Sequence, residues 1–317
     1  MVHEKAITLK QLRALAALVR TGSLTAAAEA LSVTPPAIST QLRTLEQNIG
    51  AALMRRGGDG RNAPTAQGLE LLAAAQRVET ALALCFRRIE ALNAGHAGFV
   101  ALGVVSTGKY FAPGLVAQAR AALPGVEIGL TVGNRAEIIE ALTAGSVDLA
   151  IMGRPPRAPA VRDDVLGAHP YVMIAPPGHP LTRRGEAPVE ALLEETFLLR
   201  EPGSSTRILT ERYLDRIGDG RPWKSIELGT NETIKQAVIA GLGVAVISAH
   251  TVAPELESGR LEVVRAAGLP IMRRWFLIHR ADAELTPAGE TLRRFVVCLG
   301  DSVLPAIPER CLRAEAP

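Results

Sequence analysis

The sequence predicts an all-α N-terminal domain with a long linker helix behind it, followed by a larger α/β domain of two lobes. Two patterns along the chain carry this prediction. Apolar residues recur at helical spacing as far as Leu92, and from Phe99 onward short apolar strands alternate with helices. A chain of 317 residues is also too long for one ordinary core. We therefore expect a helical head joined to an α/β region.

Residues 23–46 predict two short helices joined by a tight turn. Ser23 and Thr34 are able to cap them, and Pro35 stands at the first helical position of the second, where its missing N–H costs nothing. The second helix turns an apolar face inward, formed by Ile38, Leu42 and Leu45. Its other side presents small and polar residues, namely Ala37, Ser39, Thr40 and Arg43. Such a surface suits insertion into a DNA major groove, which makes this pair a candidate helix-turn-helix.

The flanking segments decide between that hypothesis and an ordinary Ala-rich helical hairpin. Upstream, Thr8 and Gln11 predict a capping box for a third helix, whose apolar face is formed by Leu12, Leu15, Leu18 and Val19. Downstream, residues 53–65 form a basic loop with two adjacent glycines, a proline and three arginines, Arg55, Arg56 and Arg61. Such a loop is typical of a wing that lies along the phosphate backbone.

Residues 8–68 resemble the winged helix-turn-helix of the LysR-type transcriptional regulators. The matching stretches are residues 23–28, 36–39, 41–42, 45–46 and 65–68. Pro35 stands where that family often has Gln, and Thr40 where Arg is frequent, so two long polar side chains are missing from the groove-facing helix. The resemblance implies a regulator of transcription that binds double-stranded DNA through this domain. We assign the domain to residues 1–65.

Composition fits that class. Lys and Arg number 35 against 32 Asp and Glu, but among the first 65 residues eight basic side chains face four acidic ones. The positive field therefore belongs to the predicted DNA-binding segment. Three widely spaced cysteines, Cys85, Cys298 and Cys311, predict neither a disulfide framework nor a metal site. The sequence shows no signal peptide and no run of about 18 apolar residues, so we expect a cytoplasmic protein without a membrane span.

Residues 66–94 predict a linker helix with a coiled-coil seam. Apolar residues repeat there at alternating spacings of four and three, at Leu71, Ala75, Val78, Leu82, Cys85, Ile89 and Leu92. The alternative is a helix that packs on its own domain. In the LysR-type family two subunits pair through this helix, so the resemblance implies a homodimer and leaves a tetramer open. Paired heads would prefer an operator that is an imperfect inverted repeat.

Residues 93–98 read as a hinge to the α/β domain, which we assign to residues 95–303. The expected strands are residues 99–106, 126–132, 147–152, 171–175, 243–248 and 273–280, and the expected helices are residues 113–123, 136–144, 205–217, 233–240 and 286–299. Their order resembles the two-lobed, periplasmic-binding-protein-like effector domain of the same family. Lobe 1 would comprise about residues 95–167 and 268–303, and lobe 2 about residues 168–267. The sequence assigns no role to the tail of residues 304–317.

Polar residues follow several of these strands and predict an effector cleft between the lobes. The candidates are Ser106, Thr107, Lys109, Asn134, Arg135, Ser204, Ser205, Thr206, Arg207, Asn231, Glu232 and Thr233. Hydroxyls and free N–H groups at helix starts favour an anion, and Lys109, Arg135 and Arg207 add cationic donors. Taken singly, each such turn is also explained by simple helix capping. Together they indicate a site for a phosphate or carboxylate metabolite.

Enzyme motifs are weak or absent in the sequence. Residues 103–109 match most of a phosphate-binding P-loop, but Tyr110 stands where Ser or Thr would hold magnesium. His169 and His179 have no catalytic partner in the sequence, and no nucleophile elbow is present. We therefore expect no catalytic residues, no metal and no cofactor. The rival hypotheses are an unrecognised enzyme and a cytoplasmic metabolite-binding protein without promoter function.

Within the family the chain is most similar to the regulators of the RuBisCO operon, which control Calvin-cycle carbon fixation. The resemblance covers residues 104–113, 132–135, 150–156, 201–207, 231–237 and 241–244. It implies an effector that is a phosphorylated metabolite, such as a sugar phosphate or phosphoenolpyruvate, or NADPH. It also implies RNA polymerase as a partner at the promoter. The alternative within the family is a regulator of another operon that senses a different small anion.

Overall fold

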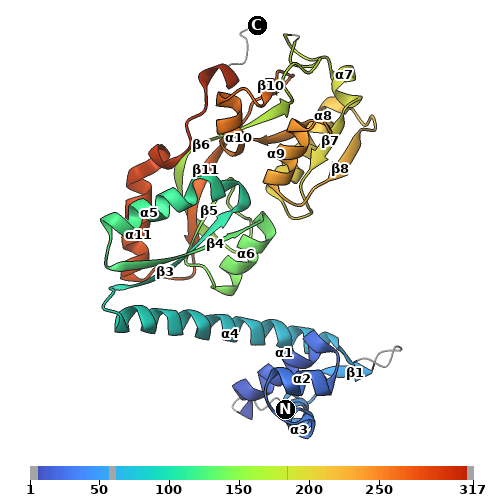
Figure 1. The fold of residues 1–317 in the computed structure, drawn as a ribbon. Helices are drawn as coiled ribbons and strands as arrows, with labels where there is room; N and C mark the ends of the chain where they lie inside the picture. The colour runs from blue at the N-terminus through green and yellow to red at the C-terminus, as the bar shows by residue number, and fades with distance from the viewer. Residues whose placement is uncertain (1–5, 57–61, 184, 313–317) are drawn as a thin grey trace. The chain divides into compact units, whose positions relative to one another are not determined.

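The computed structural model describes residues 6–56, 62–183 and 185–312, and divides the chain into two compact units, Met1–Phe86 and Arg87–Pro317 (Figure 1). The first unit holds α1 (Leu9–Thr21), α2 (Leu24–Ala30) and α3 (Pro35–Ile49), then the antiparallel hairpin β1 (Met54–Arg56) and β2 (Asn62–Pro64). The linker helix α4 (Ala66–Asn93) follows and continues into the second unit. The helix-turn-helix, the wing and the long helix all lie where the sequence predicts them.

One apolar cluster holds α1, α2 and α3 together. It contains the inward residues of the three helices and Leu53 at the start of the wing. The predicted capping box at α1 is confirmed, with reciprocal hydrogen bonds between Thr8 and Gln11 of 2.8 and 3.4 Å. Ser23 and Thr34 occupy N-cap positions, but neither side chain makes the predicted capping bond. Both residues are exposed, so water is able to satisfy the free N–H groups instead.

The turn into the wing is held by α3 and α4. Glu46 accepts hydrogen bonds from the N–H groups of Leu53 and Met54 at 2.8 and 3.3 Å, and Thr65 donates to the carbonyl oxygen of Ala52 at 2.7 Å. At Gly68 a Cβ atom would lie 2.0 Å from the carbonyl oxygen of Leu53, so only glycine lets α4 approach this turn. These contacts explain why Glu46, Thr65 and Gly68 accompany the wing.

Lobe 1 of the second unit is built on parallel strands. β3 (Gly98–Val105) pairs with β4 (Val126–Gly133) on one side and β5 (Leu149–Met152) on the other. α5 (Ala112–Ala122) and α11 (Pro287–Leu299) lie together on one face, and α6 (Arg135–Ala144) covers the other (Figure 1). Between β3 and α5 the chain forms a short 3₁₀ helix, Ser106–Tyr110, and α5 begins one residue before its predicted start at residue 113.

Two long antiparallel strands, β6 (Val161–Ala175) and β11 (Ile271–Arg280), run through both lobes and connect them. Lobe 2 adds β9 (Ala245–Ser248) and β10 (Glu262–Val264) to β6, and carries a separate parallel pair, β7 (Thr196–Leu199) and β8 (Lys224–Glu227). Its helices are α7 (Val189–Leu193), α8 (Ser205–Gly218), α9 (Asn231–Ile239) and α10 (Ala249–Glu257). The main sheet is therefore mixed, with strand order β10-β6-β11-β5-β3-β4.

Several lobe 2 elements differ from the sequence prediction. The strand expected at residues 171–175 begins ten residues earlier, at Val161. The added part, residues 161–170, contains Asp163, Asp164 and Pro170, so it lacks the apolar pattern of a strand and is held by pairing with β11. The elements α7, β7, β8, α10 and β10 were not predicted. Four of them have at most five residues, and α10 has a proline, Pro254, inside the helix. The described part of the C-terminal tail packs on the core of lobe 2 through Ile307 and Leu312.

Among the residues that the structure describes, none of the helices combines the length and the apolar character needed to span a bilayer.

Candidate DNA-binding and effector-binding sites

The helix-turn-helix presents most of the predicted DNA-contacting residues to solvent. Ile38, Leu42 and Leu45 are buried on the inner face of α3, which leaves the opposite face free. Ser23, Thr34, Pro35, Thr40, Arg43 and Arg55 are exposed, and Ala37 and Ser39 are half-buried. Arg61 and the side chain of Arg56 lie outside the described residues. The exposed ones among these side chains are available to contact DNA, as the DNA-binding hypothesis predicts.

The linker helix α4 keeps much of its predicted seam exposed. Val78, Ile89 and Leu92 are 42, 45 and 59% exposed, and Cys85 is exposed with them. Leu71 instead packs against the apolar cluster of the head, Ala75 is buried, and Leu82 is half-buried. Phe86, which the seam omits, is 57% exposed beside Cys85. An uncovered apolar row of this kind is expected on a helix that pairs with another copy.

The structure separates the predicted cleft residues into those near Arg200, those near Tyr110, and Arg135 and Ser205 at the arginine pocket, and it places Arg207 apart from all of these. Ser106, Asn134 and Asn231 lie at the end of β3, the end of β4 and the start of α9, around Arg200 and Glu201. The sequence did not single out Arg200. Ser204 and Thr206 are buried at the start of α8. Arg200 is 3% exposed, and its guanidinium bonds Glu201, Asn231 and, across the lobes, Ser106. Thr107 is buried within the 3₁₀ helix. This group forms the inner part of the cleft.

A second group links the lobes through Tyr110. Its hydroxyl donates to Glu232 at 3.4 Å, and Glu232 pairs with Lys235, which also pairs with Glu255 at 2.9 Å. Burial and the neighbouring carboxylates raise the pKa of Tyr110, so it stays a neutral donor. Lys109 lies over the Tyr110 ring, and Thr233 lies in the first turn of α9, where Thr230 accepts a hydrogen bond from its N–H. Glu232 therefore has partners within the protein and is not a free effector contact.

The structure corrects the sequence prediction for Arg207. It was expected to supply a cation to the effector, but its guanidinium pairs with Glu211 at 2.8 Å and with Glu227 at 2.5 Å. Two carboxylates already neutralise it, so it has little to offer an anion. The sequence could not show this, because Glu227 lies on β8, which was not predicted.

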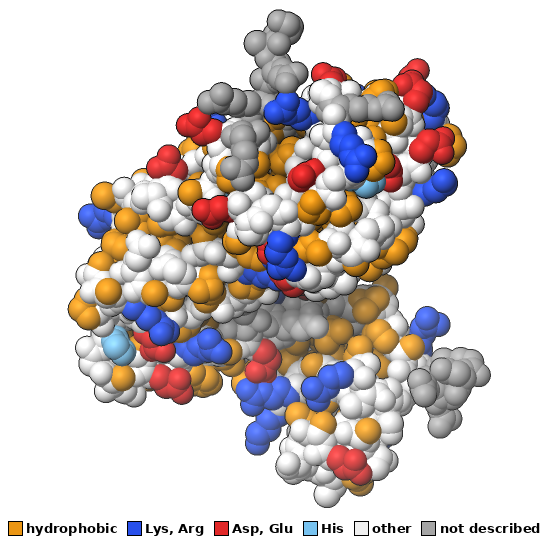
Figure 2. Space-filling model, turned by 45° about the horizontal axis from the view of Figure 1, so that its top comes forward, with side chains coloured by type: hydrophobic (Ala, Val, Ile, Leu, Met, Phe, Trp, Pro, Cys, Tyr) orange, Lys and Arg blue, Asp and Glu red, His pale blue; other side chains and the backbone are white. Residues whose placement is uncertain are grey.

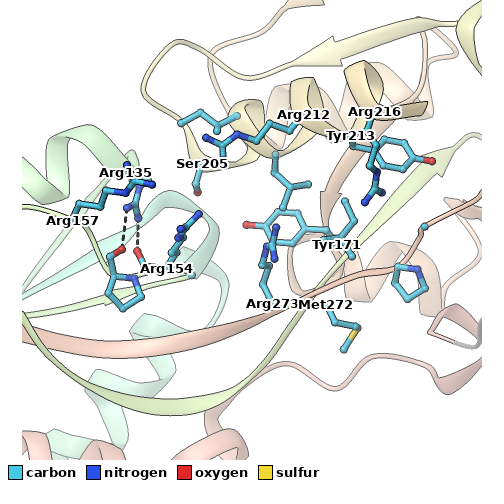
Figure 3. A pocket seen from close by; sticks show the side chains of 17 residues that line it. Arg135, Arg154, Arg157, Tyr171, Ser205, Arg212, Tyr213, Arg216, Met272 and Arg273 are labelled. Atoms are coloured by element: carbon cyan, nitrogen blue, oxygen red, sulfur yellow. Dashed lines mark hydrogen bonds between the residues drawn. The ribbon is translucent and has the colours of Figure 1, made fainter. Parts of the chain in front are cut away.

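The open part of the cleft is a pocket of about 840 Å³ with six arginines in its lining (Figure 3). Arg135, Arg154 and Arg157 come from lobe 1, Arg212 and Arg216 from α8, and Arg273 from β11. No Asp or Glu lines it, and no ion pair joins these arginines to a carboxylate within the described part of the chain. On the face shown in Figure 2, by contrast, basic and acidic side chains are interspersed over the larger unit. The pocket therefore concentrates unpaired positive charge.

Fixed side chains border these arginines. Arg135 donates to the carbonyl oxygens of Arg154 and Pro155, drawn as dashed lines in Figure 3, and its pKa is lowered by burial and by the charge of Arg154. Burial raises the pKa of Tyr171 to about 12, so its phenol remains a neutral hydrogen-bond donor. Ser205 lines the pocket from the start of α8. Of the predicted cleft residues, Arg135 and Ser205 are the two in this lining.

The strands beneath the pocket carry a buried aromatic stack. The His169 and Trp275 rings lie 3.8 Å apart between centroids and nearly parallel, and the Trp275 indole N–H donates to Nδ1 of His250 at 3.2 Å. A Cβ atom on Gly153, a pocket residue, would lie 2.8 Å from Nδ1 of His169. Burial lowers the pKa of His250 to about 4 and that of His169 well below its ordinary value, so both rings are neutral at pH 7.

Sequence reasoning missed five of the six pocket arginines. Arg154 and Arg157 flank a Pro-Pro pair, Arg212 and Arg216 are four residues apart on one helix face, and Arg273 begins an Arg-Arg pair. The i, i+4 spacing was a usable signal, because it places both side chains on one side of α8. Among the described residues, no group of His, Cys, Asp and Glu is arranged to hold a metal ion.

Two family models match the chain in succession. The model of the bacterial regulatory helix-turn-helix protein of the lysR family matches residues 9–69, and that of the LysR substrate binding domain matches residues 93–299. Among curated proteins, the chain is 50% identical to the HTH-type transcriptional regulator CbbR of Cereibacter sphaeroides, over 97% of this chain and all of the relative. It is 38% identical to the RuBisCO operon transcriptional regulator of Allochromatium vinosum, over 92 and 96% of the two chains.

Solved structures agree with this assignment. The regulatory domain of CcmR from Synechocystis PCC6803, in complex with 2-PG, is 32% identical and covers 64% of this chain and 97% of its own, with a TM-score of 0.60. The full-length LysR family regulator CbnR, in complex with its target DNA, has the same fold at 20% identity, with a TM-score of 0.70 over 93% of this chain and all of its own. The chain is therefore a member of the LysR family of bacterial transcriptional regulators.

Proposed function

We propose that this protein is a metabolite-responsive regulator of RuBisCO and Calvin-cycle carbon-fixation genes. The names of the curated relatives, at up to 50% identity over nearly the whole chain, support the choice of operon. The observation that carries the metabolite response is the arginine pocket between the lobes, because a cluster of six guanidinium groups without carboxylate partners favours an anionic ligand. DNA and phosphorylated metabolites meet in the cytoplasm, which is where the protein acts.

The effector is an anionic small molecule, such as a phosphorylated metabolite or NADPH. Arg135 and Arg154 approach the pocket from lobe 1, and Arg212 and Arg273 approach it from lobe 2 and the connecting strands (Figure 3). A ligand that bonds both sets binds best when the lobes are closed around it, so it shifts the population toward that conformation. The linker helices transmit the change to the DNA-binding heads, and RNA polymerase at the neighbouring promoter senses the altered DNA geometry.

Arg43→Ala tests the DNA-binding surface. The variant is expected to lose about one to two orders of magnitude in operator affinity, because an arginine contact to a base or phosphate contributes about 1–3 kcal/mol. Mobility-shift titrations on the DNA upstream of the neighbouring operon measure the operator affinity with and without ribulose bisphosphate, phosphoenolpyruvate or NADPH. Arg294→Ala serves as the control, because it removes the same charge from an exposed side chain of α11. Equal losses in the two variants would contradict the assignment of the surface.

Ile89→Glu tests the self-association that we propose for α4. A charge placed on the exposed row of Val78, Ile89 and Leu92 would be buried without a partner in a dimer, so the variant is expected to shift to the monomer mass in light scattering. Ala83→Glu, an exposed position of α4 away from this row, is expected to leave the mass unchanged. A wild-type protein that is monomeric at micromolar concentration would exclude the proposal, and a tetramer would extend it.

A further inference from the structure

The inner part of the cleft already contains an anion of the protein's own, the carboxylate of Glu201. Its two oxygens accept from Nε and Nη2 of Arg200 at 2.7 and 2.8 Å, which is the bidentate geometry that arginine forms with carboxylates and phosphates. Arg200 is 3% exposed, whereas the Glu201 side chain is 24% exposed. A buried guanidinium is thus neutralised by a carboxylate that is able to move out toward water.

The groups around Arg200 belong to both lobes. Nη2 of Arg200 also donates to Oγ of Ser106 in lobe 1 at 3.0 Å, and Nη1 donates to Oδ1 of Asn231 at the start of α9. Burial opposes the ionisation of Glu201, but hydrogen bonds from Arg200 and from Asn134 of lobe 1 outweigh it and lower the pKa of the carboxyl group. Glu201 is therefore charged at neutral pH and contacts the lobe opposite its own.

One donor in this cluster is left over. Asn231 is 1% exposed, and its buried Nδ2 has no hydrogen-bond partner within the described residues. A buried donor without an acceptor is costly. A carboxylate has two oxygens, and both oxygens of Glu201 are directed at Arg200. A phosphate group offers at least three, so it is able to bond Arg200 and still accept from a further donor.

We propose that Glu201 is an internal substitute for the effector's anionic group, which displaces it from Arg200. Without a ligand, Glu201 compensates the positive charge of Arg200 and links the lobes through Asn134. When a phosphorylated ligand enters, its oxygens take over Arg200 and add Ser106 and Asn231, while Glu201 turns toward water. Glu201 thereby lowers the affinity of the site for anions and sets the ligand concentration at which the regulator responds. This inference rests on the proposed function, namely anion binding in the cleft.

Glu201→Gln tests it directly. The variant keeps the size of the side chain and loses the competing charge, so inorganic phosphate and pyrophosphate are expected to bind at least tenfold more tightly than to the wild type. Binding is measured on the full-length protein by calorimetry and by the rise in melting temperature with phosphate in a phosphate-free buffer. Adding Ser106→Ala to this variant is expected to remove much of the gain in phosphate affinity, because the phosphate beside Arg200 also binds the Ser106 hydroxyl.

Glu227→Gln is the matched control. Glu227 lies on β8, is 53% exposed and pairs with Arg207. The variant removes the same charge away from Arg200, so phosphate affinity is expected to stay at the wild-type value. Glu201→Asp provides a second, milder variant, because its shorter carboxylate is unable to hold both nitrogens of Arg200 in the same geometry. If neither Glu201 variant binds phosphate more tightly than the wild type, the inference is overturned.

The two proposals fail in different ways. If the wild type binds one of the metabolites and neither Glu201 variant binds phosphate more tightly, the substitute role is wrong and the effector function stands. If neither the wild type nor any variant binds ribulose bisphosphate, phosphoenolpyruvate, NADPH or phosphate, the proposed effector function itself is wrong.

Discussion

Replacing Arg212 and Arg273 together by alanine is expected to weaken effector binding at least hundredfold and to leave operator affinity unchanged. Each side chain lines the pocket from a different element, α8 and β11, and neither has a carboxylate partner within the described part of the chain. A charge-assisted hydrogen bond contributes about 1.5–3 kcal/mol, so losing two costs about 3–6 kcal/mol of binding free energy. Calorimetric titration with each candidate metabolite measures this loss.

The control for this pair is Arg207→Ala. Arg207 is one of the three cations that the sequence assigned to the effector site, and the structure pairs it with Glu211 and Glu227 instead. Its removal is expected to change effector affinity by less than about threefold, which is within the range of a surface ion pair. A loss in Arg207→Ala that equals the loss in the double variant would show that the effector occupies another part of the cleft.

Trp275→Ala is expected to destabilise the effector-binding unit by about 3–5 kcal/mol, the usual range for removing a buried tryptophan. Trp275 is fully buried in β11, stacks on His169, meets Phe111 edge to face at 5.1 Å and bonds His250. It is held by strands and helices of both lobes, so the cavity would open where they join. Urea unfolding of the full-length protein, followed by circular dichroism, measures the free energy of unfolding.

Trp275→Phe separates packing from hydrogen bonding. It keeps an aromatic ring beside His169 and loses the indole N–H that donates to Nδ1 of His250. We expect a smaller cost than for alanine, because the cavity is smaller and one neutral hydrogen bond contributes about 1 kcal/mol. Unfolding free energies that are equal in the two variants would show that the stack contributes little to the stability of the lobe junction.

The elements with strong local patterns were predictable from the sequence. The heptad spacing in residues 71–92 predicts α4, and Thr8 with Gln11 predicts the start of α1, because capping and periodicity depend on residues a few positions apart. The first half of β6 and the strands β7 and β8 were not predictable in this way. They are short or polar, and their backbone hydrogen bonds are satisfied by strands distant in the sequence.

The candidate site shows the same division. The turns at Ser106, Asn134, Ser204 and Asn231 were identified from the sequence, because polar residues after an apolar strand are a local signal. Their partner Arg200 was missed, since an arginine at the end of a strand shows nothing of its neighbours until β7 is placed beside the starts of α8 and α9. Glu227 likewise neutralises Arg207 from a strand that the sequence did not predict.

By itself, the sequence determined the family, the order of the domains and the general location of the cleft, because these depend on motifs and periodicities within short segments. Tertiary structure alone decided which cations are free. Arg207 and Arg273 are chemically identical, but one lies against two carboxylates and the other lines a pocket with none. The physical reason is that the ability of a charge to bind a ligand depends on the other charges within a few ångströms, and those are brought close by the fold.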